Sequence, residues 1–173
     1  MLIEHRNVAN YVFGIAERLE LEGGQTFAWG SSLAVDLGHT CLFGSLILGK
    51  RLLVISLGSM HDMGRFSREL QRFNVEVLKT TPSLASALLN GDNNLRGLLV
   101  LGGEPASASL LGQLSITEDQ FRVANHYGPT EATVGACSSV AGLACEYGVS
   151  IGKPLPNYRI YILDEGDGLC PIG

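Results

Sequence analysis

The feature that most constrains the fold is the alternation of short apolar runs with amphipathic stretches along almost the whole chain. Residues 52–55 are four consecutive apolar side chains, whereas Arg65 to Phe73 carries apolar residues at helical spacing. Strands that are apolar on both faces are typical of parallel sheets, because helices cover both sides. The alternation therefore predicts βαβ units and a three-layer α/β/α architecture with a mostly parallel, flavodoxin-like sheet.

The individual elements follow from the same patterns. We predict strands over Thr26 to Trp29, Arg51 to Ser56, Val75 to Lys79, Leu98 to Leu101, Phe121 to Asn125, Val134 to Val140 and Arg159 to Leu163. We predict helices over Asn7 to Leu19, Asp36 to Leu48, Arg65 to Phe73, Pro82 to Asn90 and Ser107 to Leu114. Residues 141–148 are expected to form a loop. Because the sequence shows no internal repeat or linker, we expect residues 1–173 to form one unit.

Charge and hydropathy exclude several classes of function. Lys and Arg number 12 against 17 for Asp and Glu, which gives a formal charge of −5 without any basic run. This balance argues against nucleic acid as a partner. No apolar stretch approaches the roughly 20 residues of a membrane span, and the amino terminus lacks the apolar region of a secretory signal. We therefore expect a cytoplasmic protein without a membrane partner.

Four cysteines are scattered along the chain, with no Cys-x-x-Cys pair: Cys41, Cys137, Cys145 and Cys170. In a chain of this kind, such spacing favours buried thiols over a disulfide framework or a zinc site.

Three successive predicted strands end at residues that could contact a ligand, namely Lys79, Gly102 and His126. Ligands bind open parallel sheets outside the carboxyl ends of the strands. Lys79 lies on the same face of its strand as Val77, and a buried ammonium without a partner is strongly unfavourable. Two interpretations follow: Lys79 contacts a ligand, or it reaches solvent or pairs with a structural carboxylate such as Glu104.

The segment from Asn125 to Glu131 reads Asn-His-Tyr-Gly-Pro-Thr-Glu and follows Leu-Gly-Gly-Glu at residues 101–104. An aromatic ring, a Gly-Pro turn, a hydroxyl and a carboxylate at the end of a strand are groups suited to hold Mg-ATP. A cap of a helix or turn is the alternative role for Thr130 and Glu131. The motif resembles the nucleotide-contacting signature of adenylate-forming enzymes, in particular the adenylation domains of nonribosomal peptide synthetases.

Other segments extend this resemblance over nearly the whole chain, but only over the middle of such a domain. They are Ile3 to Asn7, Ser32 to Asp36, Thr81 to Ser83, Leu99 to Glu104, Ile151 to Pro154 and Tyr161 to Asp164. The resemblance implies that the phosphate loop, the ribose-binding aspartate and the C-terminal subdomain with its catalytic lysine lie outside this chain. We therefore expect the isolated chain to be inactive or weakly active. The implied partners are the rest of the adenylation domain and a carrier-protein domain.

The resemblance also implies roles in nucleotide binding. Tyr127 is expected to lie against adenine and Asn125 to bond its polar edge, while Thr130 contacts phosphate and Glu131 helps to hold Mg²⁺, which prefers oxygen ligands. Thr130 and Glu131 are thus the candidate catalytic residues. The implied nucleotide-binding set is Gly103, Glu104, Asn125, Tyr127, Gly128 and Thr130.

The implied substrate pocket consists of Asp36, Leu37, Thr40, Lys79, Val100, Gly102, His126, Val134 and Gly135. Asp36 is expected to hold the substrate ammonium through a charge-assisted contact. Gly102 and Gly135 would leave room for the ligand. Lys79 and His126 would then face the substrate side chain, and this ordered set resembles the family pattern for aspartate.

Charge is what separates aspartate from asparagine, which has almost the same shape. Leaving a desolvated Lys79 without its carboxylate should cost about 3–5 kcal/mol. A protonated His126 would add to this preference, whereas a neutral one could serve an amide equally well. Glutamate is one methylene longer, a difference worth roughly 1–3 kcal/mol. We expect aspartate, with asparagine as the competitor.

Two other classes of protein are alternatives. A non-catalytic amino-acid-binding module would bind aspartate without any dependence on ATP. A stand-alone flavodoxin-like protein would match the signature by accident, and the sequence offers no phosphate-binding loop in its favour.

Overall fold

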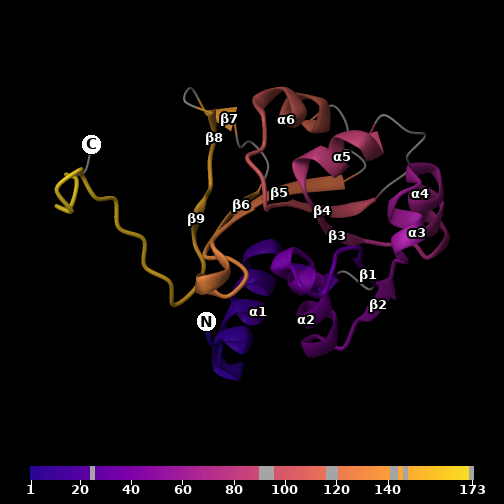
Figure 1. Ribbon diagram of the computed structural model, residues 1–173, viewed down its shortest axis with the longest axis horizontal. Coiled ribbons are helices and arrows are strands. Elements are labelled where there is room, and N and C mark those ends of the chain that lie inside the picture. Colours follow the sequence, from indigo (N-terminus) through magenta and orange to yellow (C-terminus); the bar gives the residue numbers. More distant parts are fainter. Residues whose placement is uncertain (24–25, 90–95, 116–120, 141–143, 146–147, 172–173) are drawn as a thin grey trace.

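The computed structural model describes residues 1–23, 26–89, 96–115, 121–140, 144–145 and 148–171. Over these residues the chain forms a seven-stranded sheet in the order β2-β1-β3-β4-β5-β6-β9 (Figure 1). Its strands are β1 (Thr26–Trp29), β2 (Arg51–Val54), β3 (Val77–Thr80), β4 (Gly97–Leu101), β5 (Phe121–Tyr127), β6 (Cys137–Val140) and β9 (Lys153–Pro154). β1 to β5 run parallel, whereas β6 and β9 are antiparallel to their neighbours. The parallel part has the flavodoxin-like order 2-1-3-4-5, which confirms the predicted fold class.

Helices cover both faces of the sheet, as the apolar strands require (Figure 1). α1 (His5–Leu19) and α2 (His39–Ile47) lie on one face. The other face carries α3 (Leu57–Met60), α4 (Met63–Arg72), α5 (Pro82–Leu89) and α6 (Ala108–Ser115). Short 3₁₀ helices span Leu21–Gly23, Asp36–Gly38 and Thr130–Ala132.

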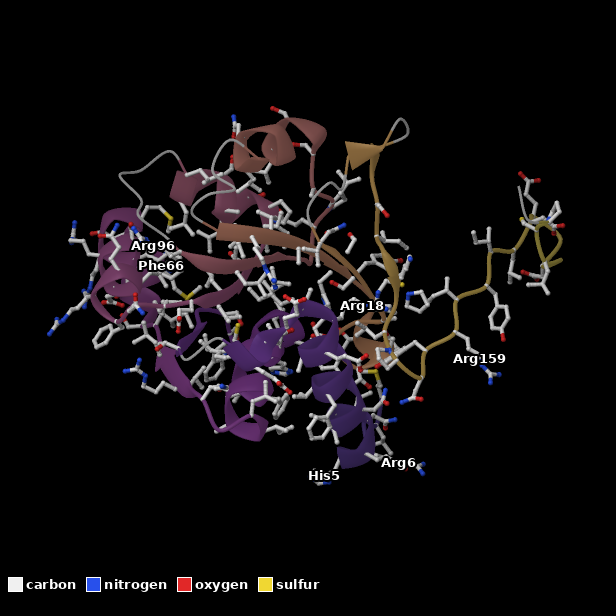
Figure 2. All side chains as sticks on the ribbon, turned by 180° about the vertical axis from the view of Figure 1, so that it is seen from behind. His5, Arg6, Arg18, Phe66, Arg96 and Arg159 are labelled. Atoms are coloured by element: carbon white, nitrogen blue, oxygen red, sulfur yellow. The ribbon has the colours of Figure 1, made fainter. Side chains whose placement is uncertain are left out.

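Each face has its own apolar core. One cluster contains Phe66, which lies between α4 and the sheet (Figure 2), together with Leu78 and Leu101. The other cluster contains Val77 and Val100, packed under α1 and α2. Adjacent residues of β3 thus enter opposite cores, as the period of a strand dictates.

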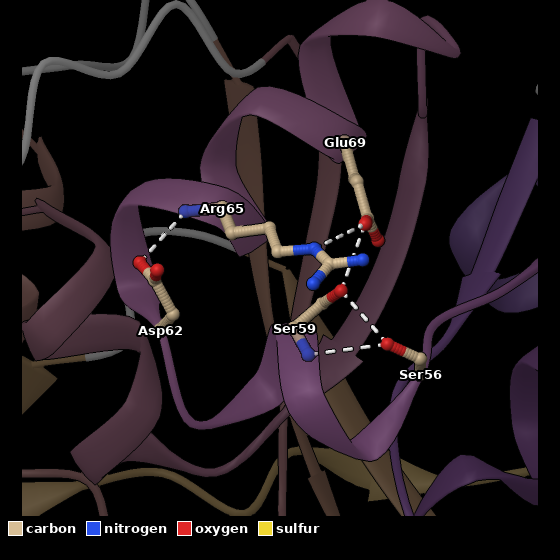
Figure 3. A network of polar contacts seen from close by, with 5 residues as sticks. All are labelled: Ser56, Ser59, Asp62, Arg65 and Glu69. Atoms are coloured by element: carbon tan, nitrogen blue, oxygen red, sulfur yellow. Dashed lines mark hydrogen bonds and ion pairs between the residues drawn. The ribbon is translucent and has the colours of Figure 1, made fainter.

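A polar network closes the junction between α3 and α4 (Figure 3). The Ser59 amide donates to Ser56 Oγ at 3.2 Å, and the Arg65 amide donates to Asp62 Oδ1 at 2.9 Å. Glu69 Oε1 accepts from Ser59 Oγ at 2.7 Å and from Arg65 Nε at 3.3 Å. Sequence analysis missed α3, although serine and aspartate before short helical stretches are N-cap signals.

The predicted strand over Arg159 to Leu163 is wrong. There the structure forms a single bridge, between Leu163 and Leu169, and the segment extends away from the body of the molecule (Figures 1 and 2). Ile162 is 73% exposed, so its apolar side chain has no core to pack against. A β-prone sequence needs a neighbouring strand and a packed face to become a strand.

Two other elements begin three residues later than predicted. The strand expected from Val134 starts only at Cys137, because Thr133 and Val134 have φ values of 62° and 68°, which are incompatible with a strand. The helix expected from Asp36 begins with a 3₁₀ turn and becomes α-helical at His39. The loop expected over 141–148 contains β7 (Ala144–Cys145) paired with β8 (Gly148–Val149), while 141–143 and 146–147, like Asn90, lie outside the described residues.

The cysteine prediction is confirmed in part. Cys41 and Cys137 are buried free thiols, whereas Cys170 is free but exposed, since it lies on the projecting C-terminal segment. In the part of the chain that the structure describes, no helix has both the length and the apolarity to cross a membrane.

Candidate functional site

The structure brings the three strand ends identified from sequence to one edge of the sheet. Lys79 in β3 pairs in register with Val100 in β4, and Gly102 follows the end of β4. His126 is the next-to-last residue of β5, which runs beside β4. The carboxyl ends of parallel strands therefore place an ammonium, a glycine and an imidazole side by side.

A continuous set of hydrogen bonds connects the side chains beneath this edge. Lys79 Nζ donates to Thr40 Oγ1 at 2.9 Å, Thr40 Oγ1 lies 2.5 Å from Tyr11 Oη, and Tyr11 Oη lies 3.0 Å from His126 Nε2. All four side chains are at most 5% exposed. We call this set, Lys79, Thr40, Tyr11 and His126, the buried polar chain.

Lys79 takes neither of the structural roles left open by the sequence. It does not reach solvent, being 5% exposed, and it does not pair with Glu104. Glu104 Oε2 instead accepts from Ser83, at 2.5 Å from the hydroxyl and 3.3 Å from the amide. The one hydrogen bond that the Lys79 ammonium makes within the described residues goes to a neutral hydroxyl. A buried cation without a counter-ion is expected where a ligand supplies the missing charge.

Burial shifts the titration of this region. Desolvation lowers the pKa of Lys79 from 10.5 to about 8, although the charges of Cys41 and Asp36 oppose the shift. Desolvation, followed by the charge of Lys79, lowers the pKa of His126 well below its ordinary value, so the imidazole is neutral near pH 7. Desolvation also raises the pKa of the Tyr11 phenol, which stays protonated, and raises that of Cys41 to about 11.

Asp36 supplies the opposite charge nearby. Its Oδ2 is buried and has no hydrogen-bond partner among the described residues. Asp36 lines a cavity of about 800 Å³ beside α1 and α2, together with Val134 and Thr130. An unpartnered carboxylate oxygen on a cavity wall is suited to receive a cationic group.

Two glycines are required by the position of His126. A Cβ on Gly135 would lie 2.0 Å from His126 Cε1, so no larger residue fits against the imidazole ring. A Cβ on Gly102 would lie 3.0 Å from the His126 carbonyl oxygen and 3.3 Å from Lys79 Cε. The two glycines therefore allow the backbone to approach the histidine ring and the lysine side chain closely.

The two remaining members of the predicted pocket take different positions. Val100 is fully buried in the core under α1 and α2. Leu37 is partly exposed, and its Cδ1 comes within 3.4 Å of the point where Gly103, with φ of 80°, would carry a Cβ.

A second cavity, of about 420 Å³, lies at the end of β5. Its lining includes most of the predicted nucleotide-binding residues: Gly103, Glu104, Asn125, Tyr127 and Gly128, and also His126. Tyr127 is 53% exposed, so one face of its ring is free to stack. Asn125 Nδ2 donates one hydrogen bond to the Ser150 carbonyl at 2.9 Å, and its Oδ1 has no hydrogen-bond partner among the described residues.

Thr130 and Glu131 lie apart from this second cavity. Both are exposed in the 3₁₀ helix that follows the Gly-Pro turn, and Thr130 borders the cavity of Asp36 instead. Their side chains form no hydrogen bond with the described residues, so the structure does not support a capping role. Among the same residues, no three His, Cys, Asp or Glu side chains cluster as metal ligands. Mg²⁺ needs only one or two carboxylates when phosphates and waters complete its shell.

Comparison with known proteins shows the family to which the chain is related. The family model described as "AMP-binding enzyme" matches residues 1–173. The chain is 31% identical to surfactin synthase subunit 2 of Bacillus subtilis (strain 168), over 99% of this chain and 5% of that protein. It is 30% identical to bacitracin synthase 3 of Bacillus licheniformis, over 100% of this chain and 3% of that protein. The crystal structure of IdnL1 superposes with a TM-score of 0.83 at 17% identity, covering 96% of this chain and 36% of the other.

The chain therefore belongs to the AMP-binding enzyme family, and its resemblance to peptide synthetase segments is confirmed. It spans only a small part of the length of these relatives.

Proposed function

We propose that residues 1–173 form the amino-acid-selecting subdomain of a nonribosomal peptide synthetase adenylation domain, and that the amino acid is L-aspartate. In this role the chain helps to convert the amino acid and ATP to aminoacyl-adenylate and pyrophosphate. The observation that supports the proposal is the presence of two buried groups of opposite charge in one region. The Lys79 ammonium is buried without a counter-ion, and Asp36 Oδ2 is buried without a hydrogen-bond partner among the described residues.

These two charges complement the two ends of aspartate. Asp36 would accept from the α-ammonium, and Lys79 would donate to the side-chain carboxylate. Asparagine fits the same volume but leaves Lys79 without a counter-charge, a loss of about 3–5 kcal/mol by analogy with breaking a buried ion pair. His126, which is neutral at pH 7, would add a further polar contact.

On the nucleotide side, adenine would occupy the cavity at the end of β5, against the exposed ring of Tyr127. Thr130 would contact the phosphates, and Glu131 would hold Mg²⁺. The bound metal would neutralise phosphate charge as the substrate carboxylate attacks the α-phosphorus and pyrophosphate leaves. The partners of the chain would then be the rest of the adenylation domain and a carrier-protein domain.

Amino-acid-dependent ATP–pyrophosphate exchange tests this proposal, with the segment placed in a complete adenylation domain. We expect aspartate to give the highest exchange among the proteinogenic amino acids, and Lys79→Ala to abolish it. Lys153→Ala is the matched control, because Lys153 is exposed.

The other outcomes separate the alternatives. Exchange led by asparagine or by an apolar amino acid would keep the enzyme class and refute the role of Lys79. Saturable aspartate binding that is indifferent to ATP, without exchange, would indicate a non-catalytic binding module.

A further inference from the structure

The buried polar chain has a direction, which the donor and acceptor capacity of its members fixes. An ammonium can only donate, so Thr40 Oγ1 accepts from Lys79 at 2.9 Å. The hydroxyl hydrogen of Thr40 then has an acceptor in Tyr11 Oη, at 2.5 Å. Tyr11, having accepted, donates its own hydrogen to His126 Nε2 at 3.0 Å.

The opposite direction leaves a buried donor unsatisfied. If His126 Nε2 donated to Tyr11 and Tyr11 donated to Thr40, the Thr40 hydroxyl hydrogen would have no acceptor among the described residues. Thr40 is 0% exposed, so water could not replace that acceptor without entering the core. The positive charge of Lys79 also favours hydroxyl groups whose oxygen faces the ammonium and whose hydrogen points away from it. Both arguments select the direction from Lys79 to His126.

This direction fixes the tautomer of the histidine. A neutral imidazole has one N–H group and one acceptor nitrogen. Because Nε2 accepts from Tyr11, the hydrogen lies on Nδ1. Nδ1 has no hydrogen-bond partner among the described residues, and it lies 3.8 Å from the point where Gly102 lacks a Cβ. The N–H donor therefore lies close to Gly102, as the Lys79 side chain does, and His126 also lines the cavity at the end of β5.

We propose that Tyr11 is a positioning residue for substrate selection, which holds His126 as the Nδ1–H tautomer so that the pocket presents only donors to the substrate side chain. This inference rests on the proposed function. A side-chain carboxylate has only acceptors and can receive hydrogen bonds from both Lys79 and His126. A side-chain carboxamide has a single acceptor oxygen, so unless that one oxygen accepts from both donors, its NH₂ group faces one of them and leaves a buried donor unpaired. Tyr11 thereby turns a neutral histidine, which by itself serves acid and amide equally, into a determinant of specificity.

The tautomer can be measured without any enzymatic activity. Long-range ¹H–¹⁵N correlation spectra of the 173-residue chain, labelled at histidine, distinguish protonated from unprotonated ring nitrogens, and His126→Gln assigns the signals. We expect the Nδ1–H form in the parent chain and its loss in Tyr11→Phe. Tyr11→Leu, which also removes the phenol hydroxyl, should have the same effect and provides a second variant if Tyr11→Phe does not fold. Tyr158→Phe is the matched control, because Tyr158 donates to the Ala132 carbonyl and does not touch His126.

Two results would overturn the inference: an Nε2–H tautomer in the parent chain, or an unchanged tautomer in both Tyr11→Phe and Tyr11→Leu. A second measurement is the ratio of aspartate to asparagine in kcat/KM for exchange by the complete domain. We expect Tyr11→Phe to lower this ratio by about tenfold or more, because the freed ring can accept from the amide, while Tyr158→Phe leaves it unchanged. If neither amino acid supports exchange, the proposed function fails, and the spectra still decide whether Tyr11 sets the tautomer.

Discussion

The two faces of the sheet differ in what they bury. The face under α4, α5 and α6 has an apolar core that includes Phe66, Leu78 and Leu101. The face under α1 and α2 has a similar apolar core around Val77. Two residues further along β3, however, the same face buries the ammonium of Lys79. Leu78 and Lys79 are consecutive and equally buried, at 5% exposed each. Apolar packing explains why Leu78 is buried, but it does not explain why the Lys79 ammonium is buried.

The buried residues of the two faces therefore contribute differently to the stability of the sheet. Apolar burial on the first face contributes to the free energy of folding in proportion to the area removed from water. A desolvated lysine on the second face opposes folding, since its ammonium has lost its hydration. Proteins tolerate such local conflicts chiefly at functional sites. The comparison can be tested by substitutions that should affect one face and not the other.

Phe66→Ala should produce the largest loss of stability. Phe66 is 0% exposed, and truncating a buried phenylalanine leaves a cavity that costs about 3–5 kcal/mol in the free energy of unfolding. Urea denaturation of the chain measures this loss. Phe73→Ala is the control, since Phe73 is 44% exposed and should change stability by about 0.5 kcal/mol or less. Equal losses in both variants would refute the position of Phe66 in the core.

Lys79→Met should lower activity without lowering stability. Removing a buried cation in favour of an apolar side chain of similar length should leave the free energy of unfolding unchanged or raise it by about 1–4 kcal/mol. Aspartate-dependent exchange in the complete domain should fall by about two to four orders of magnitude, which corresponds to the loss of about 3–5 kcal/mol of binding. A destabilised Lys79→Met protein would mean that the lysine is a structural residue.

Gly135→Ala should have an intermediate effect. The new methyl group would overlap the His126 ring, so the ring must move and the hydrogen bond to Tyr11 must lengthen. We expect a loss of about 1–3 kcal/mol in stability, as for other overpacked sites, together with weaker aspartate-dependent exchange. Gly112→Ala provides the control, because a Cβ there meets nothing within 4 Å. Undiminished exchange in Gly135→Ala would argue against a role for the ring in the pocket.

The pH dependence of ligand binding and of stability should have opposite signs. Lys79 has a pKa of about 8 in the fold and of 10.5 ordinarily, so between these pH values the unfolded chain binds more protons. Raising the pH over this interval therefore stabilises the fold, as far as Lys79 is concerned. Aspartate needs the protonated ammonium, so its affinity should fall by about tenfold per pH unit above about pH 8. Calorimetric titration at several pH values measures this slope, which Lys79→Met should remove.

Sequence patterns were sufficient for the parts of the molecule that depend on local periodicity. The period of a strand predicted that Lys79 points with Val77, and the strand ends predicted that Lys79 and His126 lie together. Tyr11 could not be recognised in this way, since its apolar spacing in α1 resembles that of any core residue. Its hydroxyl acquires a role only when α1 packs on the sheet and meets His126, 115 residues away in sequence. The prediction for the C-terminal segment failed for the converse reason: its side chains favour a strand, but among the described residues it pairs only through the bridge between Leu163 and Leu169.

Substitutions in the polar network at the junction of α3 and α4 should have the smallest effects on the free energy of unfolding. Arg65→Gln removes a largely exposed pair with Glu69, one helical turn away, and should cost about 0.3–0.5 kcal/mol in urea denaturation. Ser59→Ala should cost about 1 kcal/mol, because Ser59 is 0% exposed and its hydroxyl is one of the partners of Glu69. Neither variant should change the aspartate to asparagine ratio. The network closes its hydrogen bonds within residues 56–69, whereas the buried polar chain joins four distant elements and still leaves donors free at its end. Under the proposed function, the substrate carboxylate would pair with the donors at the end of the buried polar chain, whereas the network between α3 and α4 contributes to stability.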